Sequence, residues 1–220
     1  MAMTTNRNCI VRISRYKNAL TRLKSLGFVK VFSSNLADAT GTSSAQVRKD
    51  FSLFGITGNK RGGYNIDDLI EQMNEIFGKH QVHNVIIVGL GNIGKALMRY
   101  KAFEKESIRI VAAFDIDTSK VNEEAEIPVL PFEKLGEYIR ANNIKLGVIA
   151  VPDVAAQQVF EVMKASGIKG VLNFAPMSLS GGDDVIVNNI NLEMELENLI
   201  YYVIAAEKNK ETAAGQTVMW

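Results

Sequence analysis

A glycine-rich stretch at residues 89–94 is the segment whose residue types and spacing point most directly to chemistry. It follows an apolar, β-branched run at residues 85–88, which predicts a buried strand, and it precedes a segment that predicts a helix. In a dinucleotide-binding turn, the first glycine permits the sharp bend, the second admits a pyrophosphate and the third lets the helix pack closely. Free amides at the helix start then face the anion. The candidate cofactor-binding residues of this turn are Gly89, Leu90, Gly91, Asn92, Ile93 and Gly94.

An aspartate at the end of the next apolar run indicates which dinucleotide would bind. Asp115 stands 21 residues beyond Gly94, where a carboxylate is expected to accept hydrogen bonds from ribose hydroxyls. A carboxylate at this position favours NAD(H) and repels the 2′-phosphate of NADP(H). A glycine-rich turn that binds another ligand, or none, remains the alternative.

Two later turns are expected to line the same cleft, because ligands of open α/β sheets lie across the carboxyl ends of the strands. They are Val151 with Pro152 and Ala175 with Pro176, and each pair follows a predicted strand. No histidine follows residue 83, no Tyr-x-x-x-Lys pair occurs and no cysteine is near the cleft. We therefore predict no catalytic residue, and we expect the cofactor to be sensed and not used as a reagent.

The first part of the chain carries a different charge from the rest. Residues 1–64 contain eleven basic and two acidic residues, a net charge of +9, whereas residues 65–220 contain 14 basic and 22 acidic residues, a net charge of −8. This asymmetry indicates that only the front part meets a polyanion.

A helix-turn-helix is the predicted basic module. Apolar spacing predicts helices at residues 10–26, 35–40 and 44–54, with Gly41 in the turn and Ser43 and Gln46 as a capping box. The outward face of the third helix carries side chains that can bind phosphates and base edges. A glycine-rich loop at residues 57–65 predicts a β-hairpin wing with two basic residues at its tip. The candidate DNA-binding residues are Ser44, Gln46, Arg48, Lys49, Lys60 and Arg61.

The elements that position the nucleotide site alternate between strand and helix, which predicts an α/β fold with a parallel, doubly wound sheet. Strands are expected at residues 84–88, 108–114, 127–130, 145–151, 170–174 and 185–187, and helices at residues 69–77, 92–103, 132–141 and 154–166. An apolar helical stripe from residue 192 to residue 204 predicts a helix that packs on a second subunit. Packing of this helix on its own sheet remains the alternative.

Four segments follow from this pattern. We expect a winged helix DNA-binding domain at residues 1–80, a Rossmann-like NAD(H)-binding domain at 81–190, a dimerisation helix at 191–208 and a tail without regular structure at 209–220. His80 and His83 lie near the first boundary and are expected to be solvated linker residues, because further metal ligands are lacking there. We predict no metal site.

Composition is typical of a soluble globular protein, with 220 residues, 47% hydrophobic and 22% charged. No apolar stretch approaches the roughly 20 residues that a membrane span requires. The single cysteine, Cys9, cannot form an intramolecular disulfide, and the expected location is the reducing cytoplasm.

With both parts in place, the chain resembles the Rex family of redox-sensing transcriptional repressors over about residues 14–206. The most specific stretch is QVRKDFSLFG at residues 46–55, closed by GGYN at residues 62–65, and GVLNFAP at residues 170–176 supports it. The resemblance implies a homodimer with an exchanged final helix, and a sensor of the NADH/NAD⁺ ratio that leaves operator DNA when NADH binds.

The resemblance also implies three residues of an interdomain switch. Tyr100 matches a tyrosine near the switch, and Arg15 matches an arginine that in many relatives forms an ion pair with an aspartate. Asn191 stands at the aspartate position here, so the pair would be a hydrogen bond without the salt bridge. This departure affects how strongly the two domains are held together.

Three other functions remain open from the residues alone. An NAD(P)-dependent oxidoreductase with an appended interaction domain would show hydride transfer. A DNA-binding regulator of the same fold could sense another nucleotide, such as coenzyme A. In a third class of protein, the Rossmann half would serve only for dimerisation and bind no nucleotide.

Overall fold

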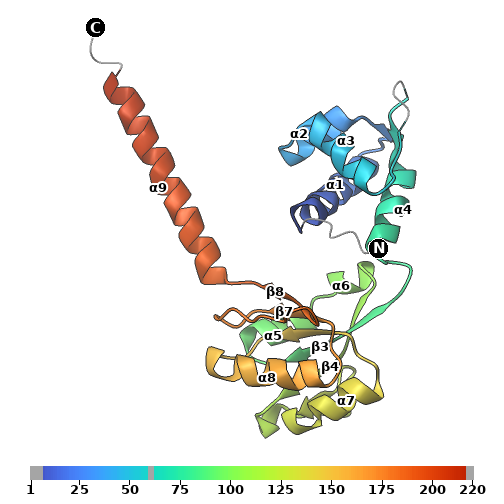
Figure 1. Cartoon of the computed structure of the whole chain (residues 1–220), viewed down its shortest axis with the longest axis vertical. Helices are drawn as coiled ribbons and strands as arrows, with labels where there is room; N and C mark the ends of the chain where they lie inside the picture. The colour runs from blue at the N-terminus through green and yellow to red at the C-terminus, as the bar shows by residue number, and fades with distance from the viewer. Residues whose placement is uncertain (1–6, 59–61, 217–220) are drawn as a thin grey trace. The chain divides into compact units, whose positions relative to one another are not determined.

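The computed structural model describes residues 7–58 and 62–216, with side chains described for residues 8–58 and 62–208. The chain divides into two compact units, Met1–Gln81 and Val82–Trp220 (Figure 1). Each unit has its own hydrophobic core.

The first unit is mostly helical. Its elements are α1 (Arg7–Ser25), β1 (Lys30–Val31), α2 (Ser33–Thr40), α3 (Ser44–Leu53), β2 (Tyr64–Asn65) and α4 (Ile66–Ile76). The turn between α2 and α3 depends on Gly41, which adopts the left-handed conformation with φ 66° and closes α2. Ser43 then caps α3, because its hydroxyl accepts a hydrogen bond from the backbone N–H of Gln46 at 3.1 Å.

Apolar side chains at helical spacing build the core of this unit. Tyr16 of α1 packs edge-on against Phe51 of α3, with ring centroids 5.8 Å apart, and Phe51 packs in the same way against Tyr64. Leu69 and Met73 of α4 are also buried in this core. The helix-turn-helix is therefore held on α1 and α4 by its inner face.

Two helix caps and a short two-stranded sheet complete the local structure of the first unit. The cap of α2 is Phe32, whose N–H donates to the Asn35 side chain at 2.9 Å. The cap of α4 is Asn65, so Asp67 and Asp68 lie within its first turn. Strand β1 was not predicted, and it pairs antiparallel with β2. The tip of the expected hairpin wing, residues 59–61, lies outside the described residues, so the wing stays a prediction.

The second unit contains a six-stranded parallel sheet with strand order β5-β4-β3-β6-β7-β8. Its strands are β3 (His83–Val88), β4 (Ile108–Asp115), β5 (Val129–Pro131), β6 (Leu146–Ile149), β7 (Gly170–Asn173) and β8 (Ile186–Asn189). Its helices are α5 (Asn92–Met98), α6 (Ala102–Lys105), α7 (Leu135–Ala141), α8 (Asp153–Ala165) and α9 (Leu192–Gln216), with short 3₁₀ turns η1 (Thr118–Lys120) and η2 (Phe132–Lys134). This arrangement confirms the predicted α/β fold class with a doubly wound sheet.

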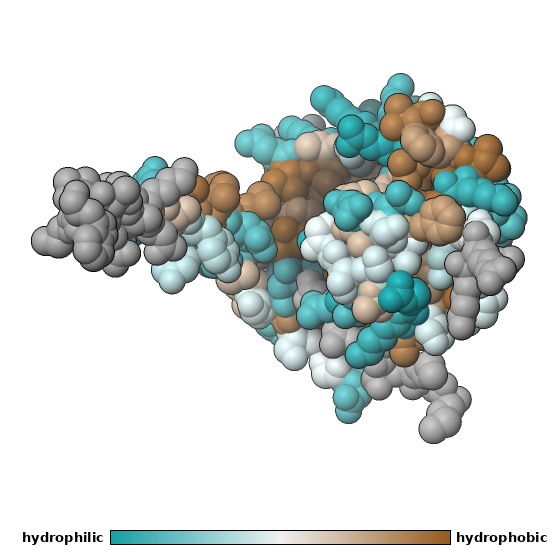
Figure 2. Space-filling model, turned by 90° about the horizontal axis from the view of Figure 1, so that it is seen from above, coloured by the Kyte–Doolittle hydropathy of each residue, from teal (hydrophilic) through white to brown (hydrophobic). Residues whose placement is uncertain are grey.

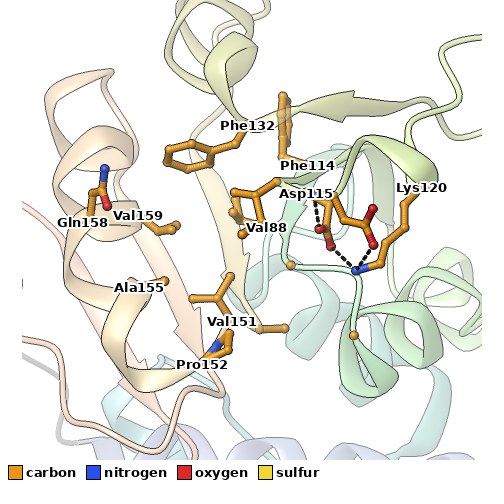
Figure 3. Close-up of a pocket in the computed structure, with 15 residues that line it drawn as sticks. Val88, Phe114, Asp115, Lys120, Phe132, Val151, Pro152, Ala155, Gln158 and Val159 are labelled. Carbon is orange, nitrogen blue, oxygen red and sulfur yellow. Dashed lines mark hydrogen bonds and ion pairs between the residues drawn. The ribbon is translucent and has the colours of Figure 1, made fainter.

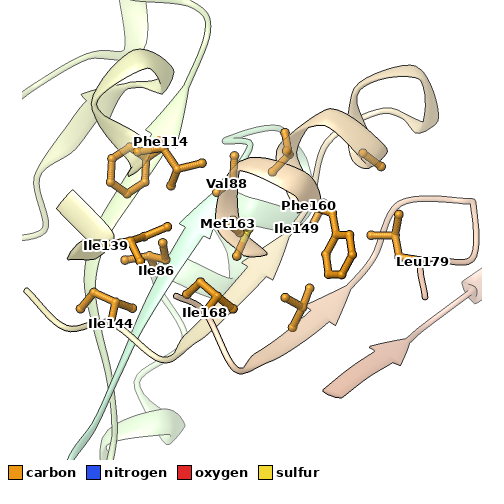
Figure 4. Packing of buried hydrophobic residues seen from close by; sticks show 14 of the residues in the cluster. Ile86, Val88, Phe114, Ile139, Ile144, Ile149, Phe160, Met163, Ile168 and Leu179 are labelled. Carbon is orange, nitrogen blue, oxygen red and sulfur yellow. The ribbon is translucent and has the colours of Figure 1, made fainter. Parts of the chain in front are cut away.

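Alternate side chains of the strands enter two separate cores, as the period of a β-strand requires. On one face, Phe160 and Met163 of α8 pack over Ile86 and Ile149 of the sheet (Figure 4). On the other face, Ile87 lies in a smaller cluster that includes residues of α5. Because the strand order reverses between β3 and β6, the carboxyl ends of these two neighbours open the crevice in which such sheets bind ligands.

Several boundaries of the second unit also differ from expectation. The helix expected at residues 92–103 is interrupted after Met98, and α6 begins only at Ala102. The strand expected at residues 127–130 is β5, Val129–Pro131. His83 is the first residue of β3 and does not lie in a linker. Helix α9 continues to Gln216, so residues 209–216 are helical where a tail without regular structure was expected.

Candidate functional site

The turn after β3 places the three glycines in different physical roles. Gly89 has φ 96°, and a Cβ there would lie 2.5 Å from the carbonyl oxygen of Ala150. A Cβ at Gly94 would overlap the carbonyl oxygen of Gly89. Gly91 is the N-terminal cap of α5, and a Cβ there would meet nothing within 4 Å. The fold therefore requires Gly89 and Gly94, whereas Gly91 leaves open space in front of the first amides of α5.

Asp115, at the end of β4, is turned toward this glycine turn. One carboxylate oxygen accepts a hydrogen bond from the backbone N–H of Leu90 at 2.7 Å, and the other accepts one from the N–H of Asp117 at 2.9 Å. Lys120 Nζ lies 3.1 Å from the first oxygen. Burial by itself raises the pKa of Asp115, but the two backbone donors and Lys120 outweigh it and lower the pKa below its ordinary value. Asp115 is therefore an ionised acceptor at neutral pH.

A cavity of about 390 Å³ opens beside these groups (Figure 3). Of the residues expected to bind cofactor, the structure brings together Gly89, Gly91, Asp115, Val151 and Pro152 around it. The opposite wall is largely apolar, with Phe132 from the segment after β5 and Val159 from α8. An apolar slot with carboxylates at its edge fits a planar base joined to a ribose.

The remaining candidates of the turn lie around the cavity without lining it. Leu90 and Gly94 are buried, and Asn92 and Ile93 are exposed at the start of α5. Lys120 lines the cavity and was missed by the sequence analysis. The only sequence signal for it is its place five residues after Asp115, in a short turn whose geometry no periodicity reveals.

Ala175 and Pro176, also expected at the cleft, do not line this cavity. Their turn is held by Asn173, which is fully buried and accepts a hydrogen bond from the Ala175 N–H at 3.0 Å. The Asn173 amide donates to the Met177 carbonyl at 2.7 Å and to the Asn189 side chain at 2.8 Å. The turn after β7 is therefore fixed to β8 by a pair of asparagines, and its role toward a cofactor stays a prediction.

In the first unit, the candidate residues of α3 fall into two groups. Arg48 and Lys49 are exposed, and Arg48 Nη1 donates to the Ser33 hydroxyl at 3.0 Å. Ser44 and Gln46 are half-buried. The Gln46 amide donates to Asp50 at 2.8 Å instead of bonding back to the Ser43 backbone, so the expected capping box is only half formed. Lys60 and Arg61 lie outside the described residues.

The three candidate switch residues belong to different units. Arg15 is exposed on α1, whereas Tyr100 and Asn191 belong to the second unit. Tyr100 is 57% exposed and packs edge-on against Phe103 with centroids 5.0 Å apart. Asn191 accepts a hydrogen bond from the Met194 N–H at 3.1 Å, so it caps α9 within its own unit. A contact between Arg15 and Asn191 stays a prediction.

Within residues 7–58 and 62–216, no three His, Cys, Asp or Glu side chains gather in a way that could hold a metal ion. None of the helices in this described part of the chain has the length and apolar character of a membrane span.

Comparisons with known proteins cover both units. A family model described as a putative DNA-binding protein N-terminus matches residues 7–52, and a model described as a CoA binding domain matches residues 80–177. The chain is 40% identical over 200 residues to the redox-sensing transcriptional repressor Rex of Desulforamulus reducens, covering 90% of this chain and 95% of the relative.

Solved structures extend this likeness to three dimensions. A crystal structure of RSP in complex with β-NAD⁺ and operator DNA matches with a TM-score of 0.88 and 29% identity, over 97% of this chain and 99% of RSP. A crystal structure of RSP in complex with β-NADH matches with a TM-score of 0.86 and 29% identity, over 96% and 100% of the two chains.

Proposed function

Because the chain belongs to the Rex family of redox-sensing transcriptional repressors, we propose that it binds operator DNA as a homodimer through its first unit and leaves the DNA when NADH binds its second unit. The observation that carries this proposal is the pairing of an exposed basic helix-turn-helix with an ionised Asp115 at a glycine turn in the same chain. RSP, a similar repressor, has been crystallised with NAD⁺ and operator DNA and with NADH.

The cavity supports NAD(H) as the ligand that is sensed. The open space at Gly91 and the first amides of α5 suit a pyrophosphate, and Asp115 suits the ribose hydroxyls. Lys120 offsets part of the negative charge of Asp115, but Asp117 adds a second carboxylate 3.6 Å from the same Nζ. The site therefore keeps a net negative charge, which disfavours a 2′-phosphate.

Helix α9 supports a dimer. Its exposed apolar residues include Leu199, Ile200 and Val203, at 58%, 58% and 49% exposure, and hydrophobic residues are visible on the molecular surface in Figure 2. An apolar hollow of about 270 Å³ on the sheet of the second unit is lined by side chains such as Leu146 and Leu172. A second copy would cover such apolar surface, and two copies would place two reading helices about 34–36 Å apart on successive major-groove faces.

The energy that the cofactor must supply sets a condition on the switch. Moving a two-state dimer from 1:99 to 99:1 requires a preference of about 5.5 kcal/mol for one state, or about half of that from each of two cofactors. NADH must therefore bind one arrangement of the dimer more tightly, since equal affinity for both arrangements shifts nothing.

We propose that the protein is a regulator without catalytic activity and that it acts in the cytoplasm. The cavity walls of the second unit offer Asp115, Lys120 and Asp117 as charged groups, and Lys120 Nζ lies 3.1 Å from Asp115 and 3.6 Å from Asp117. None of them is placed as a free acid or base for hydride chemistry. A test is the oxidation of NADH by the purified protein with a panel of carbonyl compounds, where no turnover is expected.

The second candidate is a regulator that senses coenzyme A, because the model described as a CoA binding domain matches residues 80–177. Both ligands contain an adenosine and a pyrophosphate, but the 3′-phosphate of coenzyme A would approach the carboxylates at the cavity edge. Competition of NADH, NADPH and coenzyme A for the purified protein separates the candidates. Displacement by coenzyme A at lower concentration than NADH would favour the second one.

A further inference from the structure

The orientation of the Gln46 side chain on α3 is fixed by a buried carboxylate. Its Nε2 donates a hydrogen bond to Oδ1 of Asp50, one helical turn further along, at 2.8 Å. An ionised carboxylate can only accept hydrogen bonds, so the amide must turn its NH₂ group inward. The carbonyl oxygen Oε1 is therefore the end of the amide that does not bond Asp50.

The carboxylate of Asp50 is itself firmly held. Arg12 of α1 binds it in a bidentate manner, with Nε 2.6 Å from Oδ2 and Nη2 2.7 Å from Oδ1. Tyr16 donates its hydroxyl at 3.0 Å, and the Cys9 thiol lies 3.4 Å from Oδ1. Asp50 has no exposed side-chain surface. Burial raises its pKa, but the hydrogen bonds from Arg12, Gln46, Tyr16 and Cys9 lower it below the ordinary value, which keeps it charged.

The arrangement has a direct consequence for base reading. In the major groove, the hydrogen-bond donors on base edges are the N6 amino group of adenine and the N4 amino group of cytosine, whereas guanine offers the acceptors O6 and N7. The carbonyl oxygen Oε1 of Gln46 is an acceptor and can take a hydrogen bond from such an amino group. Nε2 keeps a second N–H, so the amide also suits the N6 and N7 pair of adenine.

We propose that Gln46 determines base specificity by accepting, through Oε1, a hydrogen bond from an exocyclic amino group of adenine or cytosine, and that Asp50 is the residue that positions it. The proposal rests on the proposed function, in which α3 enters operator DNA. Exposed Arg48 and Lys49 lie on the same helix and supply phosphate and guanine contacts. Gln46 therefore recognises a hydrogen-bond donor on a base edge, whereas Arg48 and Lys49 recognise acceptors.

A purely structural role is the competing explanation. A Gln side chain that bonds an acidic residue four positions later stabilises a helix slightly, without any contact to DNA. Such a role changes stability and leaves the preference among base pairs unchanged. The two explanations are therefore separated by a specificity measurement.

The test uses the full-length protein and DNA selected by it from a random library. Binding is then measured at fixed salt on a series in which one adenine at a time is replaced by purine, or one cytosine by 2-pyrimidinone, so that only the amino group is removed. For the wild type, removal at one position in each half-site should weaken binding about 5- to 150-fold. In Gln46→Met, removal at that position should have no effect.

A matched control and a positioning variant complete the design. Gln72 is a half-buried glutamine of α4 that donates to the Asp68 carbonyl at 3.2 Å, and Gln72→Met should keep the wild-type pattern. Gln46→Glu keeps an acceptor but loses the N–H that binds Asp50, and it should lose the amino-group dependence as Gln46→Met does. NADH affinity and thermal unfolding, measured for each variant, show that the fold is intact.

Three results overturn the proposal. The first is a wild type whose binding tolerates removal of every amino group in the half-site. The second is a Gln46→Met variant whose binding still depends on the amino group. The third is a Gln46→Glu variant whose binding still depends on it, which would reject Asp50 as the positioning residue. A wild type that selects no DNA sequence at all would instead overturn the proposed function, and this inference with it.

Discussion

Replacing Gly91 by alanine should weaken cofactor binding strongly and leave the fold intact. Gly91 has φ −72° and ψ −162°, which alanine also adopts, and its Cβ would meet nothing within 4 Å. Alanine is a poorer N-cap than glycine by up to about 1 kcal/mol, but it also restricts the unfolded chain by about 0.4–1 kcal/mol. Stability should therefore change by less than about 1 kcal/mol, which is a Tm shift of at most about 4 °C.

The effect on NADH binding should be much larger than the effect on stability. The new methyl group occupies the space through which a pyrophosphate would reach the first amides of α5. Loss of two hydrogen bonds to a charged group, at about 1.5–3 kcal/mol each, amounts to at least about 3 kcal/mol. The dissociation constant for NADH should thus rise by on the order of 100-fold or more.

The assay is calorimetric titration of NADH, combined with thermal unfolding of the ligand-free protein. Gly94→Ala is the matched comparison, because its Cβ would overlap the Gly89 carbonyl oxygen, so this variant should lose stability by about 1–3 kcal/mol or more. If Gly91→Ala binds NADH as the wild type does, the pyrophosphate does not lie on this turn and the reasoning is wrong.

Three more predictions concern stability, assembly and DNA contact. Asp50→Asn should destabilise the first unit by about 3 kcal/mol, at the lower end for a buried ion pair because Arg12 is 28% exposed. Since the folded-state pKa of Asp50 is lowered, the stability that its charge contributes is full above about pH 4 and is lost as pH falls further. Thermal unfolding from pH 6 to pH 3 should therefore show a smaller loss of stability in the variant than in the wild type. Asp substitutions at exposed Leu199 and Val203 should give monomers in light scattering, whereas a dimer would exclude α9 from the interface. Alanine at both Lys60 and Arg61 should weaken binding to all DNA sequences alike. It should also reduce the slope of log affinity against log salt concentration by about two units, and an unchanged slope would show that these residues make no phosphate contacts.

Glycine positions and apolar periods explain why much of the fold was predictable. The turn after β3 needs a positive φ and two close backbone approaches, and only glycine meets such demands, so Gly89 and Gly94 reveal the turn directly. The alternation of buried runs with helical spacing likewise predicts the parallel sheet. These signals are local, which is why a single sequence carries them.

Polar partnerships across long sequence separations were not predictable in the same way. Gln46 was expected to complete a capping box with Ser43, but its amide is held by Asp50, and Asp50 is held by Arg12, 38 residues earlier. The Asn173 and Asn189 pair links two neighbouring strands through side chains that look like ordinary loop asparagines in the sequence. Only the packing of the helices and strands brings these groups together, and no periodic pattern encodes it.

The break between α5 and α6 is a further example. Residues 92–103 contain no proline or glycine after Gly94, so the sequence predicts one helix. In the structure the chain turns after Met98, and Tyr100 becomes 57% exposed at the break. A continuous helix is favoured locally, and the connection that leads the chain into β4 overrides this preference.

The most direct test of the central claim is operator binding measured at fixed salt and fixed total nucleotide while the NADH/NAD⁺ ratio is varied. A redox sensor predicts that binding falls steeply as the ratio rises and returns when NADH is reoxidised. Operator affinity that stays constant across all ratios, in a protein that still binds NADH, would contradict the account.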